Sequence, residues 1–318
     1  MSIHVNVDNF VRAETDRMLV ANQRIAGGVN RLHHNRVPTP IDSQPVVRMN
    51  RDTLYSLAVL DLAKPVELVL PHAGDRYMSA MVVNNDHYVP LVLHSAGKYW
   101  LSVTEAGTRY ALVAIRILVD PVDPADVEAV QALQDGIDVV ADGGEDLVMP
   151  DYNLADLDAT RTALEVLGSG LDGYDGAFGA KGQVDPIRHL IGTATGWGGL
   201  PSSEAVYVSA VPDDPAIDSR LTLVDVPVDA FWSVSVYNDE GFFEPNPHGR
   251  YSVNSVTAVP DETGAVEVRF VHGAPEGPND IPVPERWGIV TRLYQPHDPV
   301  LTGAWRVPPL SPVASTML

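Results

Sequence analysis

The chain of 318 residues contains no cysteine. This absence excludes disulfide bonds, thiolate metal sites, iron–sulfur clusters and a thiol nucleophile. Lysine is also scarce, since three lysines stand beside 18 arginines. Together these 21 cations face 42 Asp and Glu residues, and the formal net charge is −21. Such an excess of carboxylates argues against partners that need clustered cations, namely nucleic acid and anionic membrane surfaces.

Two explanations of this acidic composition stay open. A surface rich in carboxylates and poor in lysine is typical of adaptation to high salt, because hydrated carboxylates repel one another at high net charge. A GC-rich genome gives the same composition, because its codons favour Arg, Ala, Val, Asp and Gly. The sequence alone does not separate the two.

Long hydrophobic runs are missing as well. The longest covers residues 111–119 and contains Arg116, which makes it far too short to span a membrane. The first residues lack the basic stretch and apolar stretch of a secretory signal. A hydrophobic content of 45% still indicates an ordered, globular chain. We therefore expect a cytoplasmic protein with no membrane partner.

Short apolar runs separated by Gly, Pro and Asn predict strands in residues 46–119 and 205–294. The first of these strands is expected over residues 46–55. The fold class predicted from this pattern is mainly β (α+β), with two antiparallel β-sandwich-like units. The predicted domains are 1–120, 121–200 and 201–318: an N-terminal β unit with a leading helix, a helical and Gly-rich connecting segment, and a C-terminal β-sandwich-like unit.

Apolar residues at helical spacing predict four helices, the first capped by Asp8 and ended by Gly27 and Gly28. The other three are expected over residues 124–133, 154–167 and 185–191. The proline-rich tail over residues 296–312 is expected to lack regular structure.

The usual cofactor motifs are missing from the sequence. No Gly-x-Gly-x-x-Gly opens a helix after a strand, and neither a phosphate-binding Gly-x-x-x-x-Gly-Lys loop nor a Gly-x-Ser-x-Gly elbow occurs. The ten histidines lack the spacing of metal ligands. We therefore expect neither a cofactor nor a metal.

The densest polar stretch, residues 48–56, is flanked by apolar segments. On a strand, Arg48, Asn50 and Asp52 would share one face. One interpretation is a buried network in which Arg48 pairs with Asp52. The other is a pocket wall, in which Arg48 clamps an anion, Asn50 and Tyr55 orient the substrate, and Asp52 acts as an acid or base.

Two further stretches attract notice. Trp197 lies among glycines, which suits either a plug between domains or the apolar wall of a pocket. Alternation over residues 231–238 places four side chains on one face, which is unusually polar for a core strand: Phe231, Ser233, Ser235 and Tyr237. That face either belongs to a hairpin held by aromatic pairs or lines a cavity.

These stretches carry a family resemblance. Residues 47–56 (VRMNRDTLYS) resemble the signature of the bacterial domain of unknown function 1254. The resemblance to its usual partner, domain of unknown function 1214, rests on residues 196–199 (GWGG), 231–238 (FWSVSVYN), 250–254 (RYSVN) and 292–296 (RLYQP). The resemblance implies a two-part, β-rich architecture. It implies no particular reaction. Residues 279–282 (NDIP) depart from the family's Asn-x-Leu-Pro pattern.

The function expected from these patterns is a cofactor-independent enzyme, of hydrolase or lyase type, acting on a polar or anionic small molecule. Its pocket is expected between the two β units. The alternative is a protein that binds a small molecule without catalysis, or a structural or partner-binding protein; self-association is compatible with either. The candidate catalytic residues are Asp52, Tyr55 and Tyr237, and the candidate substrate-binding residues are Arg48, Asn50 and Trp197.

Overall fold

The computed structural model describes residues 2–44, 47–171 and 173–313. The chain forms two compact units, and the predicted class, mainly β with two sheet-rich units and a leading helix, is confirmed. The segment expected as a connector over residues 121–200 groups with unit 1 from Asp123 onward. Unit 1 comprises Met1–Arg36, Thr53–Val119 and Asp123–Ser202, and unit 2 comprises Val37–Asp52, Asp120–Val122 and Ser203–Leu318.

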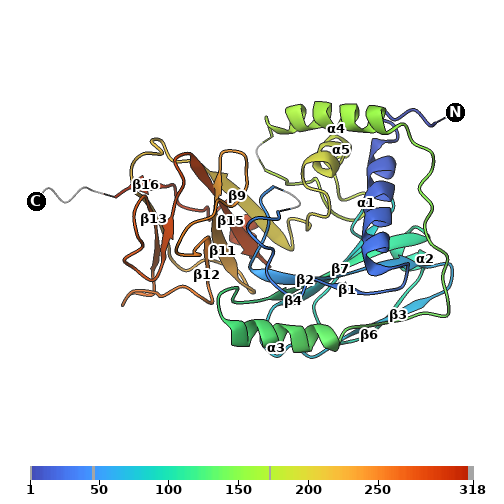
Figure 1. Ribbon diagram of the computed structural model, residues 1–318, viewed down its shortest axis with the longest axis horizontal. Helices are drawn as coiled ribbons and strands as arrows, with labels where there is room; N and C mark the ends of the chain where they lie inside the picture. The colour runs from blue at the N-terminus through green and yellow to red at the C-terminus, as the bar shows by residue number, and fades with distance from the viewer. Residues whose placement is uncertain (1, 45–46, 172, 314–318) are drawn as a thin grey trace, which may run out of the picture. The chain divides into compact units, whose positions relative to one another are not determined.

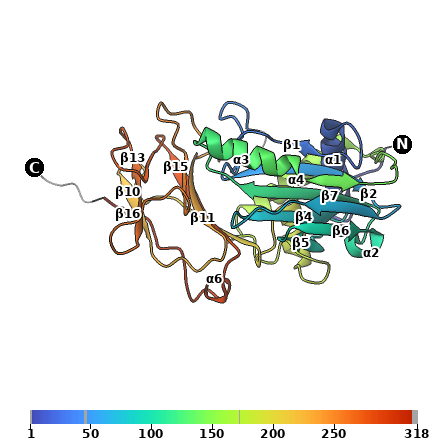
Figure 2. The ribbon, with the colours of Figure 1, turned by 90° about the horizontal axis from the view of Figure 1, so that it is seen from below.

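Unit 1 is built on a five-stranded antiparallel sheet, seen with α3 across it in Figure 2. A three-stranded sheet and α3 pack against one face and bury an aliphatic core, to which Leu60, Leu68, Leu101 and Val130 belong. Across the first sheet the strands are β1 (His33–His34), β2 (Thr53–Asp61), β7 (Tyr110–Leu118), β4 (Met78–Asn84) and β5 (Leu91–Leu93). The second sheet and its neighbours comprise β6 (Gly97–Leu101), β3 (Val66–Leu70), β8 (Asp138–Val140), α2 (Val103–Ala106) and α3 (Pro124–Asp135).

Three helices lie on the other side of the five-stranded sheet, opposite α3, β3 and β6 (Figure 1). They share a core that includes Phe10, Leu157 and Ile191. Polar caps fix where two of them begin, because Asn153 and Asp185 each accept two backbone N–H bonds from the first helical turn. The helices are α1 (Phe10–Ala26), α4 (Leu154–Gly168) and α5 (Pro186–Thr195).

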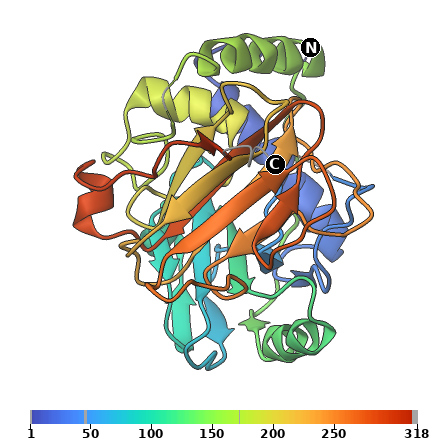
Figure 3. The same cartoon turned by 90° about the vertical axis from the view of Figure 1, so that its left-hand side faces the viewer.

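Unit 2 contains two four-stranded sheets, whose strands are gold to red in Figure 3. The side chains of Val234, Val236, Val268 and Phe270 help to form the core between the sheets. One sheet is β12 (Ser252–Asn254), β11 (Trp232–Asn238), β15 (Trp287–Tyr294) and β9 (Ala205–Ala210). The other is β14 (Asp280–Pro282), β13 (Val266–Val271), β10 (Ser219–Leu223) and β16 (Ser311–Pro312), with β14 parallel to β13.

Three details differ from the sequence-based predictions. The first long strand begins at Thr53, not at residue 46. The first helix begins after Asn9, and Asp8 is not its cap. The tail is partly regular: α6 (Asp298–Leu301) is a single turn, and β16 adds to the sheet edge beside β10 because Val313 donates its N–H to the Asp218 carbonyl.

Candidate functional site

The six candidate site residues fall into two groups, one in each unit. In each group an arginine that was not among the candidates contacts some of the members. Arg292 donates to Arg48 and Tyr237 in unit 2, and Arg116 contacts Tyr55 and the residue after Trp197 in unit 1. The idea of a shared pocket stays a prediction. The unit 2 group is Arg48, Asn50, Asp52 and Tyr237, and the unit 1 group is Tyr55 and Trp197.

The segment around Arg48 is a loop rather than the predicted strand. Arg48 has a φ of 53°, in the left-handed region that a strand does not use. Two residues on, the Asn50 side chain accepts the Asp52 N–H at 2.8 Å, which is an Asx turn. Both features stop the extended conformation before Thr53, so the predicted strand faces of Arg48, Asn50 and Asp52 are wrong.

The loop is fastened to the polar face of β11 and β15. The predicted alternation on β11 is correct, since Trp232, Val234 and Val236 enter the sandwich core. On the other face, Tyr237 donates its hydroxyl to the Met49 carbonyl at 2.7 Å. This polar face is therefore covered by residues of the loop.

Arg292 on β15 organises this face, although the sequence analysis did not select it. It is buried, and its guanidinium donates to Ser235 Oγ at 3.1 Å, Tyr237 Oη at 2.7 Å and the Arg48 carbonyl at 2.8 Å. Burial opposes its charge, but Tyr237, Tyr294 and Asp52 outweigh this and raise the pKa of Arg292. The sequence does contain a signal for Arg292, because it is the one charged residue in the otherwise largely apolar strand Trp287–Tyr294.

The Asp52 carboxylate is fully buried and does not pair with Arg48. Its Oδ1 accepts the Asn254 side-chain N–H at 3.1 Å, and its Oδ2 has no hydrogen bond among the described residues. Arg48 is exposed instead. The interpretation of a buried Arg48–Asp52 pair therefore does not describe this loop.

A pocket of about 390 Å³ opens in unit 2 beside this loop. Its floor and walls come from β9, β11, β15 and the hairpin turn after Asn238, and Arg48 and Tyr237 both line it. Arg286 also lines it and pairs with Asp239 at 3.1 Å. The Arg48 guanidinium has no hydrogen bond or ion pair with any residue in the described part of the chain. Burial raises the pKa of Tyr237, although Arg292 acts in the opposite direction.

Tyr55 and Trp197 lie in unit 1 on the side of the sheet that α1 and α5 cover. Tyr55 stands opposite Arg116 on the neighbouring strand, with the guanidinium 5.3 Å from the ring centre. Arg116 also donates to the Gly198 carbonyl at 3.0 Å, next to Trp197. The Trp197 indole N–H donates to Thr15 at 3.2 Å. Trp197 is therefore held by its own bond to Thr15, and the residue after it is held by Arg116.

His87 stacks on Trp197, with the ring centres 5.4 Å apart. Its Nε2 accepts the Gly198 N–H at 2.9 Å. Its Nδ1 lies 2.8 Å from Thr193 Oγ1, whose own hydrogen is donated to the His189 carbonyl. His87 is therefore the neutral form with the proton on Nδ1. Burial, and secondly the charge of His189, lower the pKa of His87 to about 3.

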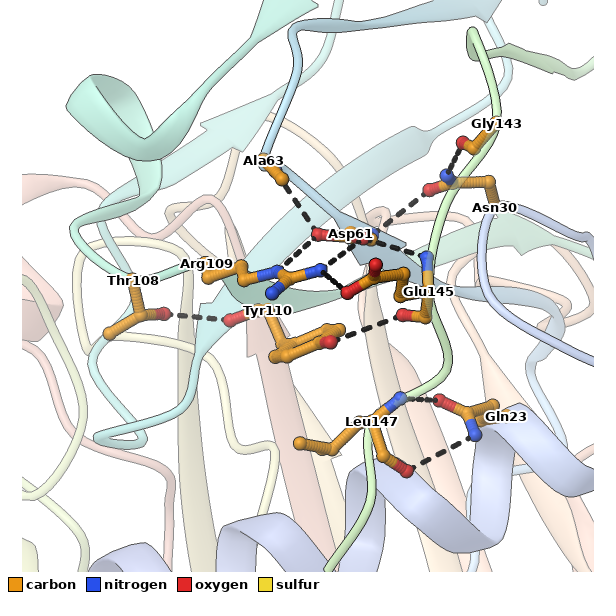
Figure 4. A network of polar contacts seen from close by, with 10 residues as sticks. All are labelled: Gln23, Asn30, Asp61, Ala63, Thr108, Arg109, Tyr110, Gly143, Glu145 and Leu147. Atoms are coloured by element: carbon orange, nitrogen blue, oxygen red, sulfur yellow. Dashed lines mark hydrogen bonds and ion pairs between the residues drawn. The ribbon is translucent and has the colours of Figure 1, made fainter.

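A second pocket, of about 650 Å³, lies in unit 1 between the end of α1 and residues 143–146. The network in Figure 4 fastens that segment to the sheet: Asp61 binds Arg109 through two bonds and accepts the Glu145 N–H. The hydrogen bonds from Arg109 lower the pKa of Asp61 to about 2 against the effect of burial. Every group of this network has a structural partner, so we assign it no ligand.

The described ranges contain no cluster of three His, Asp or Glu side chains suited to a metal ion. Among the same residues, no helix is both long enough and apolar enough to cross a membrane.

Comparison with family models confirms the resemblance seen in the sequence. Residues 29–98 match the family described as Protein of unknown function (DUF1254), and residues 212–298 match the family described as Protein of unknown function (DUF1214). The order is the predicted one. Neither description names an activity, and no curated protein matches the chain.

Two solved structures are similar in fold. The VPA0106 protein from Vibrio parahaemolyticus is 17% identical, with a TM-score of 0.73 over 98% of this chain and 100% of that one. A putative uncharacterized protein from Burkholderia cenocepacia is 13% identical, with a TM-score of 0.53 over 91% of this chain and 84% of that one. At these identities the likeness establishes the fold alone.

Proposed function

We propose that unit 2 binds a small organic molecule with an anionic group in the 390 Å³ pocket, and that Arg48 binds the anion. The observation that carries this proposal is Arg48 itself. Arg48 lines the pocket, its guanidinium has no partner among the described residues, and its backbone holds an uncommon left-handed conformation. Strained backbone is concentrated at ligand-binding sites, where the surrounding structure holds it.

The size and chemistry of the pocket agree with this class of ligand. A volume of about 390 Å³ suits a small molecule. Arg286 pairs with Asp239, so of the two arginines that line the pocket Arg48 is the one without an ion pair among the described residues, while Glu240 adds a negative charge at the turn. Guanidinium and carboxylate groups form short, charge-assisted hydrogen bonds, often two at a time.

The test is calorimetric titration with benzoate, citrate and inorganic phosphate as probes. Arg48→Asn is the informative variant, because Asn removes the guanidinium and still tolerates the left-handed backbone. We expect at least one probe to bind the wild type and to lose tenfold to a hundredfold in affinity in the variant, which corresponds to about 1.5–3 kcal/mol for a hydrogen-bonded charge.

The matched control is Arg220→Ala in the same unit. Arg220 forms an exposed pair with Glu267 on the other sheet and does not line the pocket. Its loss should change probe affinity less than twofold. Equal affinity of the wild type and Arg48→Asn for every probe that binds would refute the anchoring role of Arg48.

Catalysis is the second candidate function, as hydrolase or lyase chemistry without a cofactor. It is favoured by the contact between Arg292 and the hydroxyl of Tyr237, which lines the pocket. Tyr237→Phe tests the second: turnover of a bound substrate should be lost if Tyr237 moves a proton. Turnover is compared at saturating substrate, because the variant also loses the bond from Tyr237 to the Met49 carbonyl of the loop. The buried Asp52 contributes to either function only through the loop.

We also propose that the protein is cytoplasmic and that nucleic acid is not among its partners. The excess of carboxylates supports the second of these. Self-association is tested directly by light scattering on the purified protein.

A further inference from the structure

Arg292 donates a hydrogen bond to the loop around Arg48 but does not line the pocket. It sits on the central strand β15, opposite Ser233 on β11 and Tyr207 on β9. Only 3% of the residue is exposed. A probe molecule in the pocket therefore meets Arg48 and Tyr237, while Arg292 lies behind both of them.

The backbone of Arg48 is held at both of its polar groups. Its N–H donates to the Gly241 carbonyl at 2.7 Å, and its carbonyl accepts from Arg292 Nη2 at 2.8 Å. The same Nη2 donates to Tyr237 Oη at 2.7 Å, and Tyr237 in turn donates to the next carbonyl, that of Met49. Two consecutive carbonyls of the loop are thus bound by one connected pair of side chains.

We propose that Arg292 is a positioning residue, which keeps the Arg48 backbone in the left-handed conformation that presents its guanidinium to the pocket. The inference rests on the proposed function of Arg48. A non-glycine residue leaves this conformation unless its surroundings hold it. The bond from Arg292 comes from a buried side chain on the central strand β15, whereas Gly241 belongs to a hairpin turn.

The chemistry of the guanidinium explains why this position needs arginine. Its planar fork serves Ser235, Tyr237 and the Arg48 carbonyl at the same time. Lysine keeps the charge, but its ammonium is a point charge on a flexible stem and does not reproduce the fork. Arg292→Lys should therefore preserve the positive charge but no longer hold the Arg48 backbone in place.

The experiment compares Arg292→Lys with Thr291→Val, using the same benzoate, citrate and phosphate titrations. Thr291 is the buried neighbour on β15, its register partner Val234 packs into the sandwich core, and its hydroxyl has no partner among the described residues. We expect Arg292→Lys to lose at least tenfold in affinity for the probe that depends on Arg48. Thr291→Val should stay within twofold of the wild type.

A crystal structure of Arg292→Lys should show Arg48 outside the left-handed region. A folded Arg292→Lys protein that binds within twofold of the wild type, or that keeps Arg48 near its present φ, overturns the inference. If this variant does not fold, the wild type bound to the probe decides: an Arg292–Arg48 distance beyond hydrogen-bonding range overturns it, and a retained bond supports it. Failure of the proposed function looks different, because Arg48→Asn would then bind like the wild type.

Discussion

The imidazole of His87 is held in one protonation state by its two hydrogen-bond partners. The Gly198 N–H needs an acceptor, and Nε2 provides it. Protonation of Nε2 would break this bond, because the new N–H of the ring would point at the N–H of Gly198. It would also create a charge in a fully buried ring, which is costly. His87 is therefore expected to remain neutral in the folded protein throughout the physiological range.

This neutrality predicts a dependence of stability on pH. The pKa of His87 falls from 6.5 to about 3 on folding, so between these values the unfolded chain binds the proton more strongly. The stabilisation is complete above about pH 6.5, decreases as the pH falls, and is exhausted near pH 3. The expected slope is about 1.4 kcal/mol of unfolding free energy per pH unit.

Denaturant unfolding of the wild type and His87→Asn between pH 8 and pH 5 measures this slope. Asn tolerates the left-handed φ of 60° at this position and does not titrate. The variant should lose most of the slope, whereas His248→Asn, at an exposed histidine, should keep it. Identical slopes in all three proteins would show that His87 does not titrate as described.

Sequence reasoning reached Arg48 and Tyr237 because polar residues stood where an apolar pattern was expected. Arg292 belongs to the family motif over residues 292–296, and it is the residue that binds both. Its role depends on cross-strand register, which places Arg292 opposite Ser233. Local spacing does not determine the register between distant strands. A lone arginine in an apolar strand therefore marks Arg292 as unusual, but the sequence does not identify its partners.

At the scale of elements, the segment over residues 142–147 is held at its centre by side chains from β2 and from the start of β7, and near its ends by Asn30 and Gln23 (Figure 4). The side chain of Asp61 is 2% exposed, and it accepts from Arg109 and from the N–H groups of Ala63 and Glu145. The Tyr110 hydroxyl donates to the Glu145 carbonyl at 3.1 Å. The backbone of Glu145 is therefore fixed at both of its polar groups, its N–H by Asp61 and its carbonyl by Tyr110.

Asp61→Asn should release this segment. Asn has one acceptor oxygen, so it does not serve Arg109 and the two amides together. The shift of the Asp61 pKa from 3.8 to about 2 corresponds to about 2 kcal/mol at neutral pH, which is present above 3.8 and lost as the pH falls toward 2. We expect the variant to lose about that amount and the Glu145 amide to exchange hydrogen faster.

Asp142→Asn is the control within the same segment. Asp142 pairs with Lys64, and both side chains are largely exposed, so the pair is screened by water and salt. Its loss should leave both stability and exchange at Glu145 unchanged. If both variants behave alike, the segment is not held by Asp61.

Helices and central strands were predictable because their spacing and their caps are local. The exceptions lie where tertiary contacts outweigh a local pattern. The strand predicted from residue 46 starts outside the described residues, and over residues 47–52 the Asx turn at Asn50 and the bonds to β11 and β15 impose a loop. The parallel pairing of Asp280–Pro282 with β13 likewise follows from distant contacts.

At the scale of the whole molecule, with a net charge of −21, salt has two opposite effects on the stability of the folded protein. Screening weakens the attraction within ion pairs such as Arg220–Glu267 and the repulsion among carboxylates alike. Exposed pairs each contribute between about 0 and 1 kcal/mol. With 42 carboxylates and 21 cations, half of the carboxylates remain without a cation even if every cation forms a pair. Repulsion should therefore dominate.

If the acidic composition is an adaptation to salt, the melting temperature should rise clearly between about 0.01 and 1 M sodium chloride, as the screening length shrinks from about 30 to 3 Å. Chloride is the right salt, because sulfate stabilises proteins by exclusion from their surface whatever their charge. Scanning calorimetry at a fixed pH of 8 keeps His87 neutral throughout the series. A melting temperature indifferent to chloride would favour the codon explanation, because carboxylates fixed by genome composition need not crowd one another in the folded protein. A decrease would mean that attraction within the ion pairs outweighs the repulsion, and it would contradict adaptation to salt.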